Sequence, residues 1–200
     1  MAIILISTAY LPPAEYFAAL LTADSAIIEK EENYIKQTYR NRCYILSTYG
    51  LQALSVPVYL GSFHKTQLKD IRIDYSKRWQ QVHLRAIQAA YSSSPYFIYY
   101  YELLEESILK NHEFLLDLNN ELLFMILKIL KSTTKIEFTA RFTPPSSGET
   151  DLRYRINPKT ASSYILKEYN HVFSSDGIMK SRLSIIDLIF NTGPETAGFL

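Results

Sequence analysis

The sequence contains very little cysteine. Cys43 is the single cysteine among 200 residues, which excludes an internal disulfide, a thiolate zinc cage and a CxxC redox pair. Because Cys43 begins an apparent strand, we expect a buried structural thiol rather than a reactive one. A lone thiol is typical of the reducing cytosol, and we therefore expect a cytoplasmic protein.

Glycine and proline are also scarce. Only six glycines and eight prolines are present, which argues against collagen-like, low-complexity and widely disordered chains. The glycines form neither a GxGxxG nor a Walker-type GxxxxGK loop, so Rossmann dinucleotide binding and P-loop chemistry have no support. A GxSxG nucleophile elbow is missing as well, which weakens an α/β-hydrolase assignment. An anion would have to be held by side chains or helix ends, and we predict no cofactor.

Net charge and long apolar runs are missing too. The 21 Lys and Arg residues face 20 Asp and Glu residues, for a net charge of +1. No whole-protein field therefore predicts binding to DNA or to an anionic membrane. The longest apolar stretch, residues 122–130, contains Lys128 and reaches about half of the ~20 residues that a membrane helix needs. We expect no membrane span.

Aromatic and aliphatic residues are abundant by contrast. Tyrosine alone occurs 16 times, and 48% of the chain is hydrophobic. This length and composition fit one globular domain over residues 1–200. The tyrosine-rich run of residues 96–101 favours helix packing, although some of its phenols could line a pocket.

The order of hydrophobic patterns predicts an α/β or α+β fold, in which a small mixed sheet packs against a helical part. Expected strands cover residues 3–6, 26–28, 43–46, 53–60, 71–73 and 136–142, with a hairpin turn at Tyr49-Gly50. Expected helices cover a segment starting near Pro12 and residues 76–91, 96–111, 114–131 and 184–190.

Two features of the last third of the chain bear on function. Residues 143–163 are rich in Pro, Ser and Gly and predict a long loop, a kind of segment that is often functional or mobile. Its charges, including Arg153, suit either an anion contact or an ordinary surface loop. In the last helix, Ser184 and Asp187 resemble an N-terminal capping box, Asn191 suits the helix end, and Gly193 supplies the stop.

Residues 33–42, NYIKQTYRNR, form a basic and aromatic segment. Arginine presents a planar fork that suits carboxylate or phosphate, and lysine adds a point charge. The segment therefore predicts a surface for a small anionic substrate. The same pattern is typical of a solvated connector, because acidic residues precede it. The candidate ligand-binding residues are Lys36, Gln37, Tyr39, Arg40, Asn41 and Arg42.

Trp79 and His83 lie four residues apart and are neighbours on a predicted helix. A histidine of near-neutral pKa can act as a general base, but a partly buried histidine with a satisfied hydrogen bond is the commoner case for this pattern. Tyr10 follows the first strand, where open α/β sheets bind ligands, and we expect it at the pocket mouth. The other histidines, His64, His112 and His171, form no HxxxH pair, so no metal site is predicted.

Several segments together resemble the WbqC-like protein family, in order along nearly the whole chain. The most specific are the Arg-Asn-Arg cluster and the LSIIDLIFN end at residues 183–191. The matching segments are Tyr10-Leu11-Pro12 with Tyr16-Phe17, Glu32-Asn33-Tyr34, residues 36–42, Ser55-Val56-Pro57-Val58, residues 71–75, Trp79 with His83, Tyr91, Ser94-Pro95-Tyr96-Phe97, Leu118-Asn119, residues 183–191 and Gly193-Pro194.

The resemblance implies a bacterial protein of the kind sometimes encoded in O-antigen clusters. A glycine-transfer role that acylates a sugar amine has been suggested for such proteins, and no established catalytic residues come with it. Pro13 and Asn157 stand where many members have tryptophan and histidine, so no role for those side chains is carried over.

Three functions are compatible with these observations. The first is a transferase of bacterial surface-polysaccharide (O-antigen, lipopolysaccharide) biosynthesis that moves a glycyl or acyl group to an amino-sugar, with His83 as base and Trp79 and the basic segment as binding residues. The second is a non-catalytic module that binds a nucleotide-sugar or another anion. The third is a structural partner in a polysaccharide complex, which predicts a flat apolar patch near Arg40 and Arg42 rather than a pocket.

Overall fold

The computed structural model describes residues 2–59, 66–145, 148, 150–160, 162, 164–171 and 180–200. Its strands are β1 (Ile3–Ser7), β2 (Ser25–Glu29), β3 (Arg42–Ser47), β4 (Gly50–Ser55) and β5 (Lys135–Phe138). Its α-helices are α1 (Ala14–Thr22), α2 (Trp79–Tyr91), α3 (Phe97–Leu109), α4 (Leu115–Ile129), α5 (Ile185–Thr192) and α6 (Thr196–Phe199). Short 3-10 turns occupy Tyr39–Asn41, Leu68–Asp70, Lys180–Arg182 and Gly193–Glu195. The predicted α/β class, with parallel and antiparallel strands, is confirmed.

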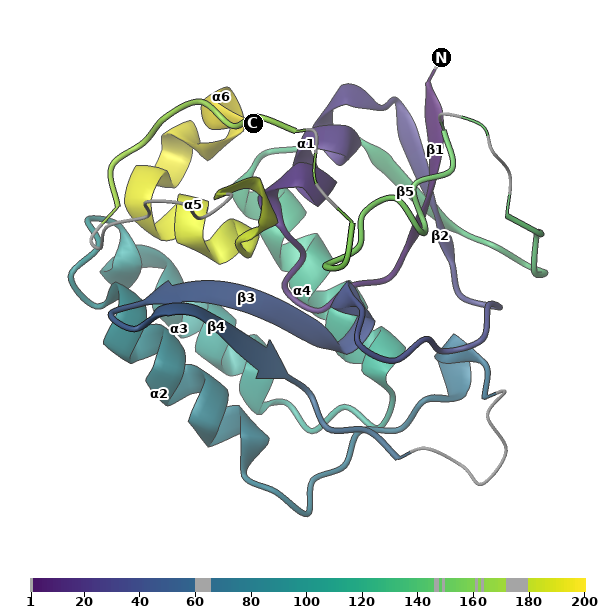
Figure 1. Ribbon diagram of the computed structural model, residues 1–200, viewed down its shortest axis with the longest axis horizontal. Coiled ribbons are helices and arrows are strands. Elements are labelled where there is room, and N and C mark those ends of the chain that lie inside the picture. The colour runs from purple at the N-terminus through teal and green to yellow at the C-terminus, as the bar shows by residue number, and fades with distance from the viewer. Residues whose placement is uncertain are drawn as a thin grey trace.

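The parallel strands form one small sheet in the order β1-β2-β5 (Figure 1). Alternate side chains such as Ile4, Ile6 and Ile28 are buried. Helix α1 makes the crossover that two neighbouring parallel strands require. The chain from β2 to β5 travels through the hairpin and α2–α4 before it returns to the sheet edge.

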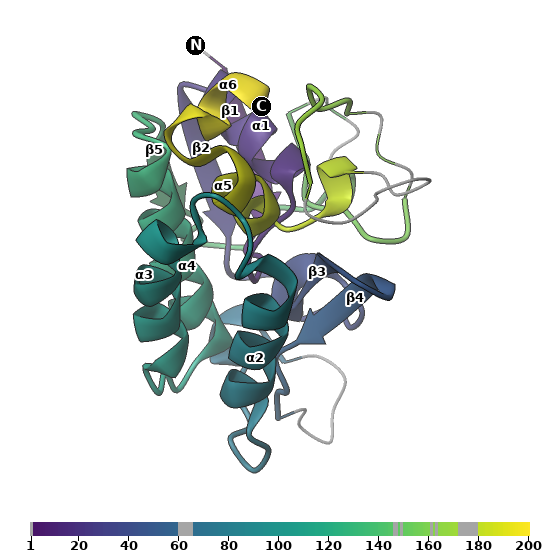
Figure 2. The same ribbon diagram turned by 90° about the vertical axis from the view of Figure 1, so that its left-hand side faces the viewer.

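The antiparallel strands β3 and β4 form a separate hairpin that lies beside α2 (Figure 2). The predicted hairpin is confirmed, with its turn at Thr48-Tyr49, one residue earlier than predicted. Gly50 begins β4 with φ 94°, a value that glycine accepts without a Cβ penalty. The second strand ends at Ser55, earlier than predicted, because Pro57 has no backbone N–H for a ladder. Residue 60, the expected end of that strand, lies outside the described residues.

The predicted strand at residues 71–73 was wrong. Ile71 and Ile73 are buried and Arg72 is exposed, as the alternation indicated. However, the segment makes only isolated bridges, from Arg72 to Phe114 and from Ile73 to Val58. It is a connector that lies between the segments of Val58 and Phe114. Alternating burial alone cannot distinguish such a connector from a strand.

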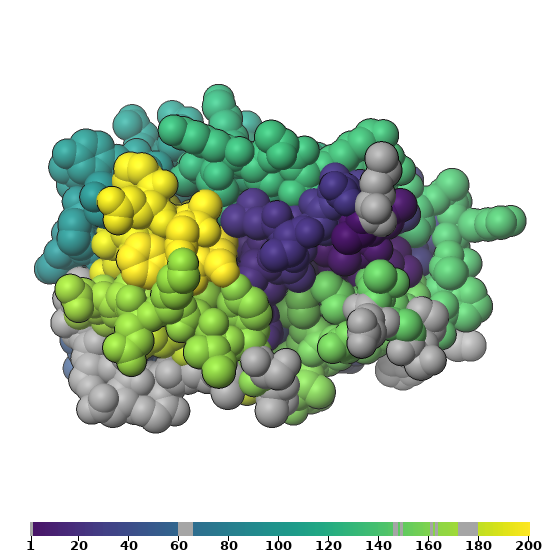
Figure 3. Space-filling view, turned by 90° about the horizontal axis from the view of Figure 1, so that it is seen from above, coloured from purple at the N-terminus to yellow at the C-terminus, as the bar shows by residue number. Residues whose placement is uncertain are grey.

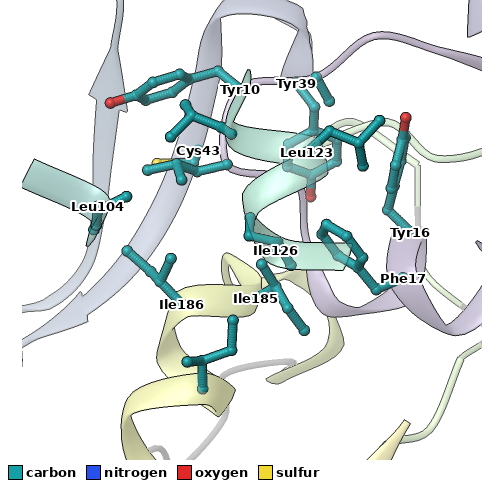
Figure 4. Close-up of a cluster of buried hydrophobic side chains, with 14 of the residues drawn as sticks. Tyr10, Tyr16, Phe17, Tyr39, Cys43, Leu104, Leu123, Ile126, Ile185 and Ile186 are labelled. Atoms are coloured by element: carbon teal, nitrogen blue, oxygen red, sulfur yellow. The ribbon is translucent and has the colours of Figure 1, made fainter. Parts of the chain in front are cut away.

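The core joins α1, α4, α5 and β3, which contribute Phe17, Ile126, Ile185 and Cys43 (Figure 4). Burial raises the pKa of the Cys43 thiol, which agrees with a structural role. The Tyr10 ring lies at the edge of this cluster, and its hydroxyl points away from the core side chains (Figure 4).

The last third of the chain covers the N-terminal elements. The described part of residues 150–171 lies at the surface next to the C-terminal helices (Figure 3). Among the described residues 139–171 there is no helix and no ladder strand, and Asp151 makes one parallel bridge to Leu5 of β1. Leu166 and Tyr169 are buried against the body.

Helix α5 begins one residue later and ends two residues later than the predicted 184–190, and it does not use Asp187 as predicted. Ser184 Oγ accepts a long hydrogen bond from the Ile186 amide at 3.5 Å, and Gly193 ends the helix with φ 54°. The Asp187 carboxylate is turned inward, where the hydroxyls of Tyr91 and Tyr169 each donate to it at 2.8 Å. Burial raises the pKa of Asp187 to about 6. Asp187 is therefore a buried acceptor between elements and not a capping residue.

Candidate anion-binding groove

An open groove of about 700 Å³ lies beside the end of the β3–β4 hairpin. Three segments form its walls: the basic segment before β3, the β4 end, and the turn that leads into α2. We call this site the basic groove. Its lining residues are Tyr34, Lys36, Gln37, Asn41, Arg42, Gln52, Ala53, Leu54, Ser55, Val56, Pro57, Val58, Asp74, Lys77, Arg78, Trp79, Val82 and His83.

Backbone hydrogen bonds hold the three walls together. Asn41 and Val56 are joined twice, by the Val56 amide to the Asn41 carbonyl and by the Asn41 side-chain amide to the Val56 carbonyl, both at 2.8 Å. The Asp74 amide donates to the Pro57 carbonyl at 2.9 Å. The β4 end is thus fixed to the basic segment on one side and to the α2 turn on the other.

The groove carries an excess of positive charge. Four cations, Lys36, Arg42, Lys77 and Arg78, share its lining with one carboxylate, Asp74. None of the four has an ion-pair partner within 4.0 Å among the described residues. Unpaired charges of one sign around a concave surface raise the local concentration of the opposite ion. The groove is therefore electrostatically suited to an anion.

The backbone at Gln37 lies in the left-handed region, with φ 60°. Residues other than glycine adopt this region uncommonly, and such outliers gather at ligand sites and turns. The conformation places Gln37 in the groove wall beside Lys36. Because Lys36 and Gln37 form a turn, the turn accounts for this conformation.

Behind the groove, Trp79, His83 and Tyr10 form a compact ring cluster. The His83 ring lies 5.2 Å from the Trp79 ring, and its Nδ1 lies 2.9 Å from the Tyr10 hydroxyl. Tyr10 is completely buried, because its ring packs at the core edge. We expected Tyr10 at the pocket mouth, whereas the structure places it behind His83, outside the groove lining.

Burial lowers the pKa of His83 to about 4, and a hydrogen bond to the Ser55 backbone opposes this shift. A ring N–H that donates to the Ser55 carbonyl leaves Nδ1 to accept from the Tyr10 hydroxyl. Both ring nitrogens are then occupied in the neutral imidazole. The assignment of His83 as a base stays a prediction, and proton transfer would require one of these bonds to open.

Arg40 lies elsewhere, inside a buried charge cluster, which we define as Glu29, Glu32, Arg40, Asp151 and Arg153. The Arg40 guanidinium is 3% exposed and contacts both Glu32 carboxylate oxygens, at 2.7 and 2.8 Å. It also donates to the Ser7 hydroxyl at 2.7 Å. This arrangement differs from the expected one, in which Arg40 would hold a ligand beside Arg42.

The same cluster takes in Arg153, which we expected in a surface loop. Its guanidinium is fully buried, bonds Asp151 at 2.6 and 2.9 Å, and reaches Glu29 at 3.2 Å. The cluster fills the carboxyl ends of β1 and β2, where open α/β sheets place ligands. The adjoining cavity is only about 10 Å³, roughly the room that one water needs.

The structure thus brings together six of the nine candidate residues and separates three. Tyr39 is buried in the core, close to Tyr44, and Arg40 and Tyr10 lie where described above. Sequence reasoning missed Lys77 and Arg78, although their place in the first turn of the helix predicted over residues 76–91 was a signal, since helix N-termini favour anions. The six that line the groove are Lys36, Gln37, Asn41, Arg42, Trp79 and His83.

Two other kinds of feature are absent from the described residues. Within the described part of the chain, no group of three His, Cys, Asp or Glu side chains is placed to hold a metal ion; His64 lies outside that part. Of the helices that the structure describes, none combines the length and apolarity that crossing a bilayer requires.

These features define an α/β protein with a basic groove formed by a hairpin and the start of a helix. A model of the WbqC-like protein family matches residues 8–170, and the chain belongs to that family. The match includes the whole basic groove. The chain is also similar to "Uncharacterized protein Rv1507c" of Mycobacterium tuberculosis (strain ATCC 25618 / H37Rv), with 26% identity over 224 aligned positions that cover 98% of this chain and 96% of the relative. No solved structure matches the chain.

Proposed function

We propose that the basic groove binds an anionic small molecule, either a nucleotide-sugar or an activated acyl donor. We further propose that the protein is a transferase of bacterial surface-polysaccharide (O-antigen) biosynthesis that moves a glycyl or acyl group to an amino-sugar. The observation that carries the proposal is four cations around one groove of about 700 Å³ that have no ion-pair partner in the described part of the chain. That volume lies within the usual range for small-molecule sites, roughly 300–1,000 Å³.

The groove residues would make different kinds of contact with the ligand. Lys36 and Arg42 supply charge for a phosphate or carboxylate, and Arg42 is held by a hydrogen bond from its Nε to Ser55 Oγ at 3.0 Å. A guanidinium fixed in this way offers its remaining donors in a defined direction. Trp79 supplies an apolar ring wall, and Gln37 an amide for orientation.

Acyl transfer to an amine needs little beyond placement of the two substrates. The amine nitrogen attacks the acyl carbonyl carbon, a C–N bond forms, the bond to the leaving group breaks, and the amine loses a proton. Holding the partners together supplies much of such a rate. A neutral His83 can accept that proton, but with a pKa of about 4 it is a weak base at pH 7, so we assign most of the rate to positioning.

A second candidate function is a binding module without catalysis. The hydrogen bonds of His83 to Tyr10 and to the Ser55 backbone favour it, because they occupy both ring nitrogens. Turnover separates the two functions: a transferase forms the acylated amino-sugar from donor and acceptor, whereas a binding module binds its ligand without turnover. His83→Gln then tests the base assignment alone, because loss of a general base would lower kcat by up to about 10²–10⁴-fold, while loss of a positioning residue would leave most of the rate. The flat patch of a structural partner is not supported, since Arg42 lines a groove.

Ligand-induced stabilisation tests the proposal. Nucleotide-sugars, aminoacyl adenylate analogues and phosphates are screened by thermal unfolding, and a ligand at 100 times its Kd should add about 2.7 kcal/mol to the free energy of unfolding. The double variant Lys36→Met, Arg42→Met should lose this shift. The control is Lys128→Met, at an exposed site on α4 outside the groove. An absent shift for every ligand, or equal loss in the control, would reject the groove as the site.

A further inference from the structure

We infer that the basic groove is built for two adjacent anionic groups, a diphosphate, rather than for one phosphate or carboxylate. The inference rests on the proposed function and selects between its two ligand classes. It favours a nucleotide-sugar, in which a diphosphate carries the amino-sugar that accepts the acyl group, over an acyl adenylate, which carries a single phosphate.

The first support is the arrangement of the four cations as two pairs. Lys36 and Arg42 come from the basic segment, whereas Lys77 and Arg78 come from the turn before α2. Both pairs are attached to the same hairpin end, because Arg42 pairs with Ser55 in the ladder and the Asp74 amide binds the Pro57 carbonyl.

The attachment points, Ser55 and Pro57, are two residues apart, which is about 7 Å of extended chain. Lysine and arginine side chains are long enough to close that gap from both sides. Two such pairs can therefore meet on neighbouring phosphates of one ligand. A single phosphate would engage one pair and leave the other pair unneutralised in the same groove.

The second support is the start of α2, a helix of 13 residues. Its first turn contains no acidic side chain, and Arg78 at the cap position makes no capping hydrogen bond. The helix itself therefore brings no carboxylate to its positive end, although Asp74 lies in the turn before it. The Trp79 amide donates to the Lys77 carbonyl, so the helix dipole and the two cations, rather than that first N–H, favour a phosphate here.

The third support is the indole of Trp79, the first residue of α2. Trp79 is 4% exposed, and its Nε1–H has no acceptor among the described residues. A buried donor without an acceptor costs about 1–3 kcal/mol. Trp79 lines the groove, but its Nε1 is itself enclosed, so an oxygen of the bound ligand would pair with it only after a shift of the surrounding wall.

The experiment compares nucleoside diphosphates with their monophosphates. Binding of UDP, UMP, ADP and AMP to the full chain is measured by isothermal titration calorimetry at one ionic strength. We expect each diphosphate to bind at least 10-fold more tightly than its monophosphate. In the double variant Lys77→Met, Arg78→Met that margin should fall below about 3-fold, with monophosphate affinity nearly unchanged. Arg85→Met, at an exposed site on α2 outside the groove, is the matched control and should keep the margin.

The outcomes separate this inference from the proposed function. Equal affinity for diphosphate and monophosphate overturns the inference and leaves an anion-binding groove. A double variant that weakens both nucleotides equally also overturns it, because Lys77 and Arg78 would then act only as general charge. If none of the four nucleotides nor the acyl adenylate analogue binds, the proposed function itself fails. Circular dichroism of each variant verifies that it is folded.

Discussion

Arg40 and Arg42 are separated by one residue, yet they belong to two different regions. Arg40 is enclosed in the buried charge cluster with Glu32, and Arg42 lines the basic groove. In a strand, two such residues would share a face. The 3-10 turn at Tyr39–Asn41 breaks that alternation, sending Arg40 toward the parallel sheet before β3 begins at Arg42.

The two regions contain the same kinds of side chain and use them in opposite ways. In the buried charge cluster, each guanidinium is hydrogen-bonded to carboxylates and the region is closed to solvent. In the basic groove, cations outnumber the one carboxylate and the wall is open. The difference shows that a cation is available for a ligand only when the fold leaves its charge without a partner.

The sharpest test of this comparison is the same substitution at both arginines. Arg40→Met leaves the Glu32 carboxylate buried without its cation, which should lower the free energy of unfolding by about 3–5 kcal/mol. Arg42→Met removes a side chain that lines an open groove and makes one hydrogen bond. It should lower the free energy of unfolding by less than about 1 kcal/mol. Urea unfolding at pH 7.5 measures both.

A double variant keeps this test informative if Arg40→Met does not fold. Glu32→Gln combined with Arg40→Met removes the uncompensated buried charge, so it should be more stable than Arg40→Met alone. Equal destabilisation by the two single variants would contradict the division of Arg40 and Arg42 between two regions.

Variation of pH tests the groove wall through His83, whereas the buried charge cluster contains no histidine. Because the pKa of His83 is lowered to about 4, from about 6.5 in an unfolded chain, the unfolded state binds more protons between these values. Stability should therefore fall as pH drops from about 6.5 toward 4. Between pH 7 and pH 4.5, the free energy of unfolding of His83→Gln should fall by about 2 kcal/mol less than that of the wild type.

Only the difference between the two proteins is diagnostic in this measurement. His171, whose pKa burial also lowers to about 4, acts in the same direction as His83. Asp187 acts in the opposite direction, because its pKa is raised to about 6 in the folded state. The folded state therefore binds the proton first as pH falls, and this group increases the free energy of unfolding. Parallel pH profiles for wild type and His83→Gln would contradict the buried, neutral state of His83.

The smallest expected effect comes from the one carboxylate of the groove. Asp74→Asn removes a negative charge but keeps the acceptor for the Ser76 amide, which lies 2.8 Å from Asp74 Oδ1. Affinity for a phosphate ligand should rise about 2- to 5-fold, and less at high salt, where charges are screened. Asp70→Asn, at an exposed site outside the groove, is the control in calorimetry. An unchanged or weaker affinity in Asp74→Asn would contradict the electrostatic account.

Local patterns predicted most of the fold. The apolar runs near residues 3–6 and 26–28, the helical spacing of α2 and the turn at Gly50 are properties of neighbouring residues. The pairing of β2 with β5 joins residues more than 100 positions apart, and no local pattern encodes such a contact. The bond from Tyr91 to Asp187 was missed for the same reason.

The candidate site was predicted in part for a related reason. Residue type indicated that Lys36 and Arg42 suit an anion, but it could not show that Glu32 neutralises Arg40. That outcome depends on burial and on a partner eight residues away across a turn. The burial of Arg153 was still harder to predict, because its partner Glu29 is 124 positions distant in the sequence.

The bridge between Asp151 and Leu5 has a consequence for self-association. The Leu5 amide donates to the Thr150 carbonyl, and the Leu152 amide donates to the Leu5 carbonyl, both at 2.8 Å. These bonds occupy the outer edge of β1, which would otherwise be open to pairing with another molecule. The opposite edge, β5, is exposed but carries the charged side chains of Lys135 and Glu137. Arg153, by holding this segment in place, thus also helps to keep the protein from aggregating through its sheet.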